Sequence, residues 1–86
     1  MNEEEELLLS TFEPCEKETA SFNISTSELA AKISFSNGLN INNGTIRRLG
    51  AALTRNNFLR HKKKGRYVWA VKELFFNNTP QSFKTL

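Results

Sequence analysis

The stretch from residue 43 to residue 57 restricts the fold of this 86-residue chain more than any other part. Ile46, Leu49 and Leu53 recur at intervals of three and four residues, which places them on one stripe of an α-helix. The positions off this stripe are largely cationic: Arg47, Arg48 and Arg55. The pattern predicts an amphipathic helix about 20 Å long, roughly long enough to lie in a DNA major groove.

Polar residues mark both ends of this helix. Asn42 or Asn43 can cap its start, and the pair Asn56 and Asn57 can turn the chain away at its end. Gly50 lies in the interior, where glycine costs about 1 kcal/mol relative to alanine. We therefore expect another helix to approach closely at this position.

The size and charge of the chain narrow its class. A chain of 86 residues forms one small domain with one modest core. Its first 18 residues carry seven glutamates and one lysine, whereas the remainder carries eleven Lys or Arg and two glutamates. A surface of one sign attracts polyanions, and phosphate is the usual partner, although a charged surface can also serve only to keep a domain soluble.

Several classes of protein do not fit. No run approaches the roughly 18 apolar residues of a membrane span, and the acidic N-terminus is wrong for a signal peptide, so we expect a cytoplasmic protein. Cys15 is the one cysteine and His61 the one histidine, and aspartate is absent, so we expect no disulfide, metal site or cofactor. We also expect no enzyme, because paired acids, an activated nucleophile and a phosphate loop are all missing.

The N-terminal third predicts one helix and one strand. A first helix is expected over residues 3–12, with Asn2 as its cap, Phe12 facing the core and Pro14 ending it. Apolar and polar residues then alternate over residues 20–24, which predicts a short strand.

The next segment carries the signals of a second helix. Ser25 and Glu28 are spaced as a capping box, which starts the helix directly after Ser25. Gly38 can adopt the left-handed conformation that ends it. In the linker that follows, Leu39 and Ile41 are expected to anchor the chain to the core, and about ten residues separate the two helices where a turn of 3 to 4 is usual.

Residues 58–73 have the pattern of a β-hairpin. Two strands flank a Lys-Lys-Gly turn, in which Gly65 supplies a positive φ. Tyr67, Trp69 and Val71 share one face, and we expect Trp69 and Val71 to pack on the helices while the lysines project into solvent. The earlier strand would pair beside this hairpin, because two strands alone are marginally stable.

The resulting α+β order, three helices with a small three-stranded antiparallel sheet, resembles the winged helix-turn-helix family. More narrowly, the motifs at residues 45–53, 57–58 and 65–69 are similar to the C-terminal winged-helix domains of virulence-associated protein E-like and phage-type primase-helicases. This resemblance implies that residues 1–76 are an accessory domain of a mobile-element or phage replication protein, beside an ATPase module. Residues 77–86 are expected to form a disordered polar tail.

The same resemblance assigns roles to particular residues. In the third helix, those expected to face the DNA groove are Thr45, Arg47, Arg48, Ala51 and Arg55. The hairpin at residues 58–73 would form the wing of such a domain. The wing residues expected to straddle the sugar-phosphate backbone are Arg60, Lys62, Lys63, Lys64 and Arg66. The implied partner is duplex or forked DNA, bound with low sequence specificity because successive lysines suit phosphate better than base edges.

A protein-docking module is the alternative interpretation. In that case the basic face would bind an acidic partner, or the acidic N-terminal segment of another copy. Docking surfaces usually present large apolar anchors, whereas the outer face of the third helix presents arginines, which favours nucleic acid. Tyr67 and Trp69 are also candidates for stacking on single strands, although we expect Trp69 to belong to the core.

Overall fold

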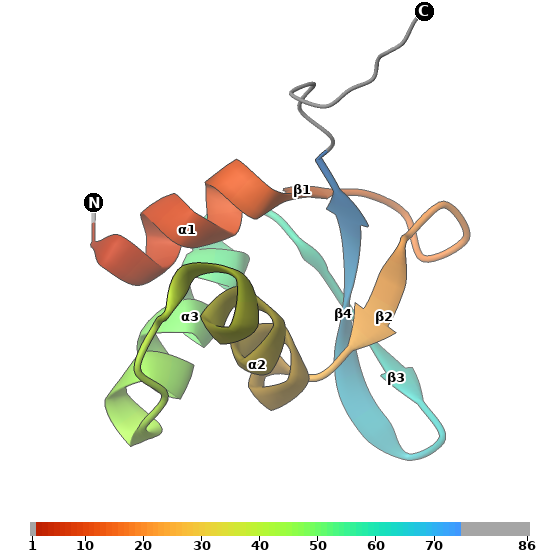
Figure 1. The fold of residues 1–86 in the computed structure, drawn as a ribbon. Coiled ribbons are helices and arrows are strands. Elements are labelled where there is room, and N and C mark those ends of the chain that lie inside the picture. Colours follow the sequence, from red (N-terminus) through yellow and green to blue (C-terminus); the bar gives the residue numbers. More distant parts are fainter. Residues whose placement is uncertain (1, 75–86) are drawn as a thin grey trace, which may run out of the picture.

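The computed structural model describes residues 2–74 and has an α+β fold (Figure 1). Three helices lie beside a small antiparallel sheet of four strands, and the last two strands form a hairpin that extends beyond the helices. The order of elements is α1 (Glu3–Thr11), β1 (Phe12–Pro14), β2 (Phe22–Ile24), α2 (Thr26–Asn37), α3 (Asn43–Arg55), β3 (Leu59–Lys63) and β4 (Arg66–Glu73).

All three helices begin at a side-chain cap. The Asn2 side chain accepts a hydrogen bond from a backbone N–H in the first turn of α1, and Asn42 does the same for α3. At α2 the capping box is complete, because Ser25 Oγ accepts from the Glu28 N–H while the Glu28 carboxylate accepts from the Ser25 N–H. The predicted starts of α2 and α3 are thereby confirmed.

The connection between α2 and α3 is shorter than the sequence suggested. Gly38, with φ of 73°, ends α2 in the left-handed conformation, and residues 38–42 complete the link. Leu39 is buried as predicted and its carbonyl accepts from Ser34 Oγ at 2.6 Å. Ile41 is 48% exposed, so the prediction that it anchors the linker is wrong. Because the link consists of residues 38–42 alone, its length is close to the 3 to 4 residues usual between such helices.

A Schellman motif ends α3. Asn57 adopts a left-handed conformation with φ of 64°, which asparagine tolerates better than most residues. Its N–H donates to the Thr54 carbonyl at 3.2 Å, and the Phe58 N–H donates to the Leu53 carbonyl at 3.0 Å. Leu53 and Phe58 are both buried in the core, which supplies the apolar contact typical of this motif.

Strand β4 is the centre of the sheet. Its Ala70 lies opposite Asn23 of β2 on one side and Leu59 of β3 on the other. The short β1 pairs with the C-terminal end of β4, where Phe12 lies opposite Glu73. The sheet is small and antiparallel, as predicted, and it has four strands where the sequence predicted three. Three residues ending in Pro14 carry little strand signal, and proline is tolerated there because β1 is an edge strand.

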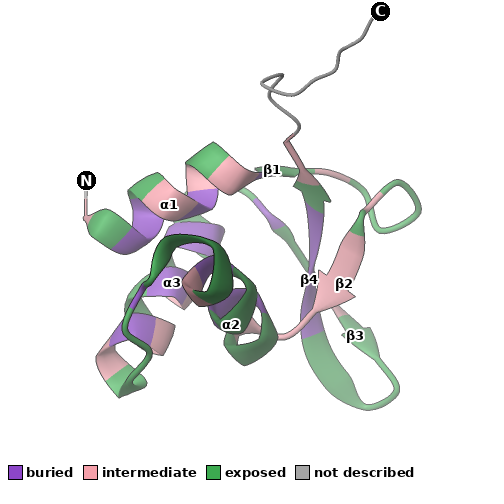
Figure 2. Cartoon of the chain, in the orientation of Figure 1, coloured by how far each residue is buried: buried purple, intermediate pink, exposed green. Residues whose placement is uncertain are grey.

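The core lies between the inner faces of the helices and the helix-facing side of the sheet (Figure 2). Trp69 is 7% exposed and its Nε1 donates to Thr26 Oγ1 at 2.9 Å, which attaches β4 to the start of α2. Trp69 and Val71 pack with the helices, as predicted. The remaining members of this core are Leu8, Phe12, Leu29, Ala30, Ile33, Leu39, Leu49, Ala52, Leu53 and Phe58.

The C-terminal predictions lie mostly outside the described residues. The Leu74 N–H donates to the Thr11 carbonyl at 2.9 Å, which joins the end of the sheet to the end of α1. The tail predicted at residues 77–86 falls beyond residue 74. Within residues 2–74, none of the helices has the length and apolar character that crossing a membrane requires.

Gly50 does not mark a close approach of helices. A Cβ added at this position would meet no atom within 4 Å, so the expectation of a tight helix contact is wrong. The glycine therefore carries its conformational cost in the helix without a compensating contact.

We predict that Gly50→Ala raises the free energy of unfolding by about 0.5–1 kcal/mol, because alanine restricts the unfolded chain and suits a helix interior. Thermal or urea unfolding followed by circular dichroism measures the change. Gly38→Ala is the matched control, since its φ of 73° disfavours a side chain although space is available. It should lower stability, and a Gly50→Ala protein less stable than the parent would contradict this account.

Candidate nucleic-acid interface

The hairpin of β3 and β4, residues 59–73, is called the basic hairpin below. Its turn is Lys64–Gly65, and both residues have positive φ, 52° and 80°. Two successive residues of positive φ form the type I′ turn, which matches the twist of a two-residue hairpin. Lys63 pairs with Arg66 across the strands, so the turn is one residue shorter than the predicted Lys63-Lys64-Gly65 turn.

All five cations predicted for the wing are exposed on this hairpin: Arg60, Lys62, Lys63, Lys64 and Arg66. They fall within seven consecutive residues that contain no acidic side chain. Figure 2 shows that the end of the hairpin is exposed on both strands. The structure therefore brings this group of predicted residues together on one projecting element.

One face of the basic hairpin combines cations with aromatic rings. The register places Arg60 opposite Trp69 and Lys62 opposite Tyr67. The Arg60 guanidinium carbon lies 4.1 Å from the centre of the Tyr67 ring, and Lys62 Nζ lies 5.5 Å from it. Such contacts are worth about 0.5–1 kcal/mol at exposed sites. They hold two positive charges against an aromatic ring that is itself 55% exposed.

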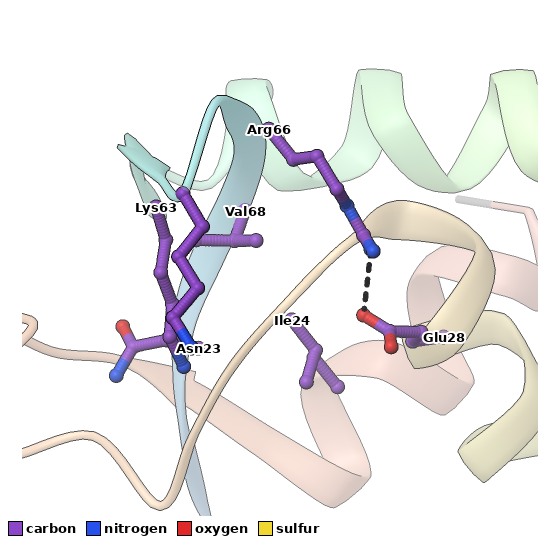
Figure 3. A pocket seen from close by; sticks show the side chains of 7 residues that line it. Asn23, Ile24, Glu28, Lys63, Arg66 and Val68 are labelled. Carbon is purple, nitrogen blue, oxygen red and sulfur yellow. Dashed lines mark hydrogen bonds and ion pairs between the residues drawn. The ribbon is translucent and has the colours of Figure 1, made fainter.

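The N-terminal end of β4 faces the start of α2 across a pocket of about 290 Å³ (Figure 3). Arg66 reaches across it to Glu28, with an N–O distance of 3.4 Å. Both side chains are more than half exposed, so this pair contributes little to stability. His61 lies nearby with its Nε2 2.7 Å from Asn23 Oδ1, which links β3 to β2 across β4. His61 is therefore partly buried in a polar contact.

In α3, fewer of the residues predicted to face the DNA groove are free to do so. Arg47 and Ala51 are exposed, as a groove-facing role requires. Thr45 is 1% exposed and its hydroxyl donates to the Asn40 carbonyl at 2.7 Å, so the prediction that it faces a ligand is wrong. Its spacing of four residues from Leu49 already places it on the buried stripe, which was the available signal.

Arg48 and Arg55 are paired with the acidic first helix. Arg48 Nη2 lies 2.8 Å from Glu4 Oε2, and Arg55 Nη2 lies 2.9 Å from Glu5 Oε1. Asn56 Nδ2 also donates to Glu5 at 2.7 Å. The arginines are half exposed, whereas the glutamate side chains are only 7% and 10% exposed. Two of the three arginines in α3 therefore bind α1, and their charges are neutralised there.

These ion pairs change the titration of the two glutamates. The hydrogen bond from Arg48 lowers the pKa of Glu4, outweighing the effect of burial. The hydrogen bonds from Arg55 and then Asn56 lower the pKa of Glu5. In return, the pKa values of Arg48 and Arg55 are raised, so both stay cationic. The division of the sequence into an acidic first segment and a basic remainder was one hint of this pairing.

Cys15 lies directly after β1, outside α3 and the basic hairpin. Burial raises the pKa of the Cys15 thiol, which disfavours the nucleophilic thiolate. Within residues 2–74, no three His, Cys, Asp or Glu side chains are grouped so that they could hold a metal ion. The expectations that the protein has no metal, no cofactor and no enzymatic activity remain predictions.

Comparisons of the chain with protein-family models, with curated proteins and with solved structures find no match. The basic hairpin is the feature in which charge is most concentrated and least neutralised by the described residues.

We predict that stability falls as the pH drops below about 4.5, the ordinary glutamate value, because the folded-state pKa values of Glu4 and Glu5 are lowered. Groups with depressed pKa values stabilise the folded state above the unfolded pKa, and this contribution disappears as they become protonated. Urea unfolding at a series of pH values measures the effect. Glu4→Gln with Glu5→Gln should flatten the acidic limb, and an unchanged limb would exclude these pairs as its cause.

Proposed function

We propose that this domain is a winged-helix module that binds nucleic acid mainly through the basic hairpin, which acts as the wing. The observation that carries the proposal is the run of five exposed cations within residues 60–66. A single ion pair, from Arg66 to Glu28, joins them to an acidic residue of the described part of the chain. Such a group neutralises phosphates and releases their counter-ions on binding.

The arrangement of helices supports the same proposal. Helices α2 and α3 are joined by a short turn, and the hairpin follows α3 directly, the order expected for a winged helix-turn-helix. In α3 the exposed candidates for the groove are Arg47 and Ala51, since Arg48 and Arg55 bind α1. With few side chains available for base edges, we infer that phosphate contacts dominate and that sequence specificity is low.

The parent protein is a second part of the proposal. The short motifs at residues 45–53 and 65–69 support an accessory domain of a mobile-element or phage replication protein of the virulence-associated protein E-like or primase-helicase kind. In that setting the partner is duplex or forked DNA in the cytoplasm, and the neighbouring module is an ATPase.

Docking onto an acidic protein is the alternative function. The observation that favours it is the packing of α1 on α3, where two glutamates of a helix bind two arginines of this face. An acidic helix therefore fits the surface of α3. The cations of the basic hairpin lie outside that contact, which is why we prefer nucleic acid.

We predict that reversing Lys62, Lys63 and Lys64 to glutamate weakens DNA binding and lowers the slope of log affinity against log salt by about 2 to 3 units. Fluorescence anisotropy with labelled DNA at several salt concentrations measures both quantities. Circular dichroism should show an intact fold, because the three side chains are exposed.

A matched control reverses three lysines outside residues 60–66: Lys17, Lys32 and Lys72. It changes the net charge by the same amount but leaves all five cations of residues 60–66 in place. Equal losses of affinity in the two variants would indicate a general charge effect, and unchanged affinity in the first would remove the hairpin from the binding surface.

A further inference from the structure

An open pocket of about 420 Å³ lies where the basic hairpin leaves the helices. It is formed by the end of α3, the start of β3 and the facing part of β4. The side chains that line it are Thr54, Asn57, Phe58, Leu59, Arg60 and Trp69. Its volume falls within the range of small-ligand pockets, and a single nucleobase is a small planar ligand.

The walls of this pocket suit a planar group with polar edges. Trp69 and Phe58 each present a small exposed part to the pocket, since they are 7% and 5% exposed and otherwise held in the core. The Asn57 side chain is exposed and forms no hydrogen bond with any other described residue. An amide offers both a donor and an acceptor, which is the combination that base edges require.

Arg60 connects the pocket to the exposed ring of Tyr67. Its guanidinium carbon lies 4.1 Å from the centre of the Tyr67 ring and 6.0 Å from the centre of the Trp69 ring. The three side chains share one face of the hairpin because of the β3–β4 register. Aromatic rings and guanidinium planes are both surfaces on which unpaired bases stack.

We propose that this face binds single-stranded nucleic acid, with one unpaired base in the pocket beside Asn57 and Trp69. A neighbouring base stacks on Tyr67 and Arg60, and the lysines of the hairpin bind the phosphates that follow. Bases in a duplex are already paired and stacked, so they cannot enter such a pocket without unpairing. The inference rests on the proposed function, because the lysines supply the phosphate contacts.

The test compares an oligothymidylate with an abasic oligomer of equal length and charge, both labelled, against the intact protein at constant salt. Fluorescence anisotropy should show that the oligothymidylate binds at least about fivefold more tightly than the abasic oligomer, which is the gain expected from one stacked base. Equal binding of the two ligands would overturn the base pocket while leaving the phosphate-binding function intact. Binding of a labelled duplex but of neither oligomer would overturn the base pocket alone, and absence of binding to all three ligands would overturn the proposed function as well.

Two variants locate the preference in this face. Tyr67→Ala removes an exposed ring, and Asn57→Gly removes the amide while keeping the left-handed backbone with φ of 64°. Each should bring the affinity for oligothymidylate towards that for the abasic oligomer, without changing the latter.

A third variant and a control complete the experiment. Arg60→Lys keeps the charge but loses the guanidinium plane, so it should reduce the preference for bases more than the salt dependence. Phe35→Ala removes a 94% exposed ring that lines a different pocket, and it should leave the preference unchanged. A full preference for bases in Tyr67→Ala and Asn57→Gly would overturn the assignment.

Discussion

The pairing of β4 with the other strands is the constraint on which this structure depends. Strands β1, β2 and β3 all form hydrogen bonds with β4. Residues 68–71 of β4 are buried, and Trp69 within them donates to Thr26 at the start of α2. The orientation of the hairpin relative to the helices is therefore set by a buried strand and one buried indole. A projecting hairpin alone would be marginally stable, whereas this one continues the central strand of a sheet.

Electrostatic pairing explains why the two basic elements of the chain differ. The sequence predicts exposed arginines on both α3 and the hairpin. In the structure, α1 places Glu4 and Glu5 against the arginines of α3. Burying these carboxylates is unfavourable unless cations and donors satisfy them, and Arg48, Arg55 and Asn56 do so. Arg48 and Arg55 therefore stabilise the contact between α1 and α3. Within residues 2–74, the cations of residues 60–66 form one ion pair, the exposed contact of Arg66 with Glu28 at 3.4 Å, so most of their charge remains available to a ligand.

Local signals predicted the elements well, because they act over a few residues. The Ser25 capping box joins residues three positions apart, and the Gly38 helix end and the Gly65 turn each depend on a glycine with positive φ. Less was predictable about long-range contacts. Glu4 and Arg48 are separated by more than forty residues, and nothing local indicates that they meet. The strand β1 was missed for the same reason, since three residues become a strand only through pairing with β4.

The candidate site illustrates the same limit. The cations of the hairpin were identifiable from sequence because all five fall within seven consecutive residues. The pocket beside Asn57 was not identifiable, because it requires α3 to end beside β3. The Schellman motif brings these elements together, since Asn57 turns the chain and Phe58 returns it to the core.

The turn of the hairpin then decides which side chains share a face. A two-residue turn at Lys64–Gly65 sets Lys62 opposite Tyr67 and Arg60 opposite Trp69. A shift of one residue would move both cations to the other face of the sheet and leave Tyr67 without them. Lys64 accepts a positive φ of 52°, which is unfavourable for a residue with a side chain. The register that this turn maintains is the feature that places charge, aromatic surface and pocket on one side of the domain.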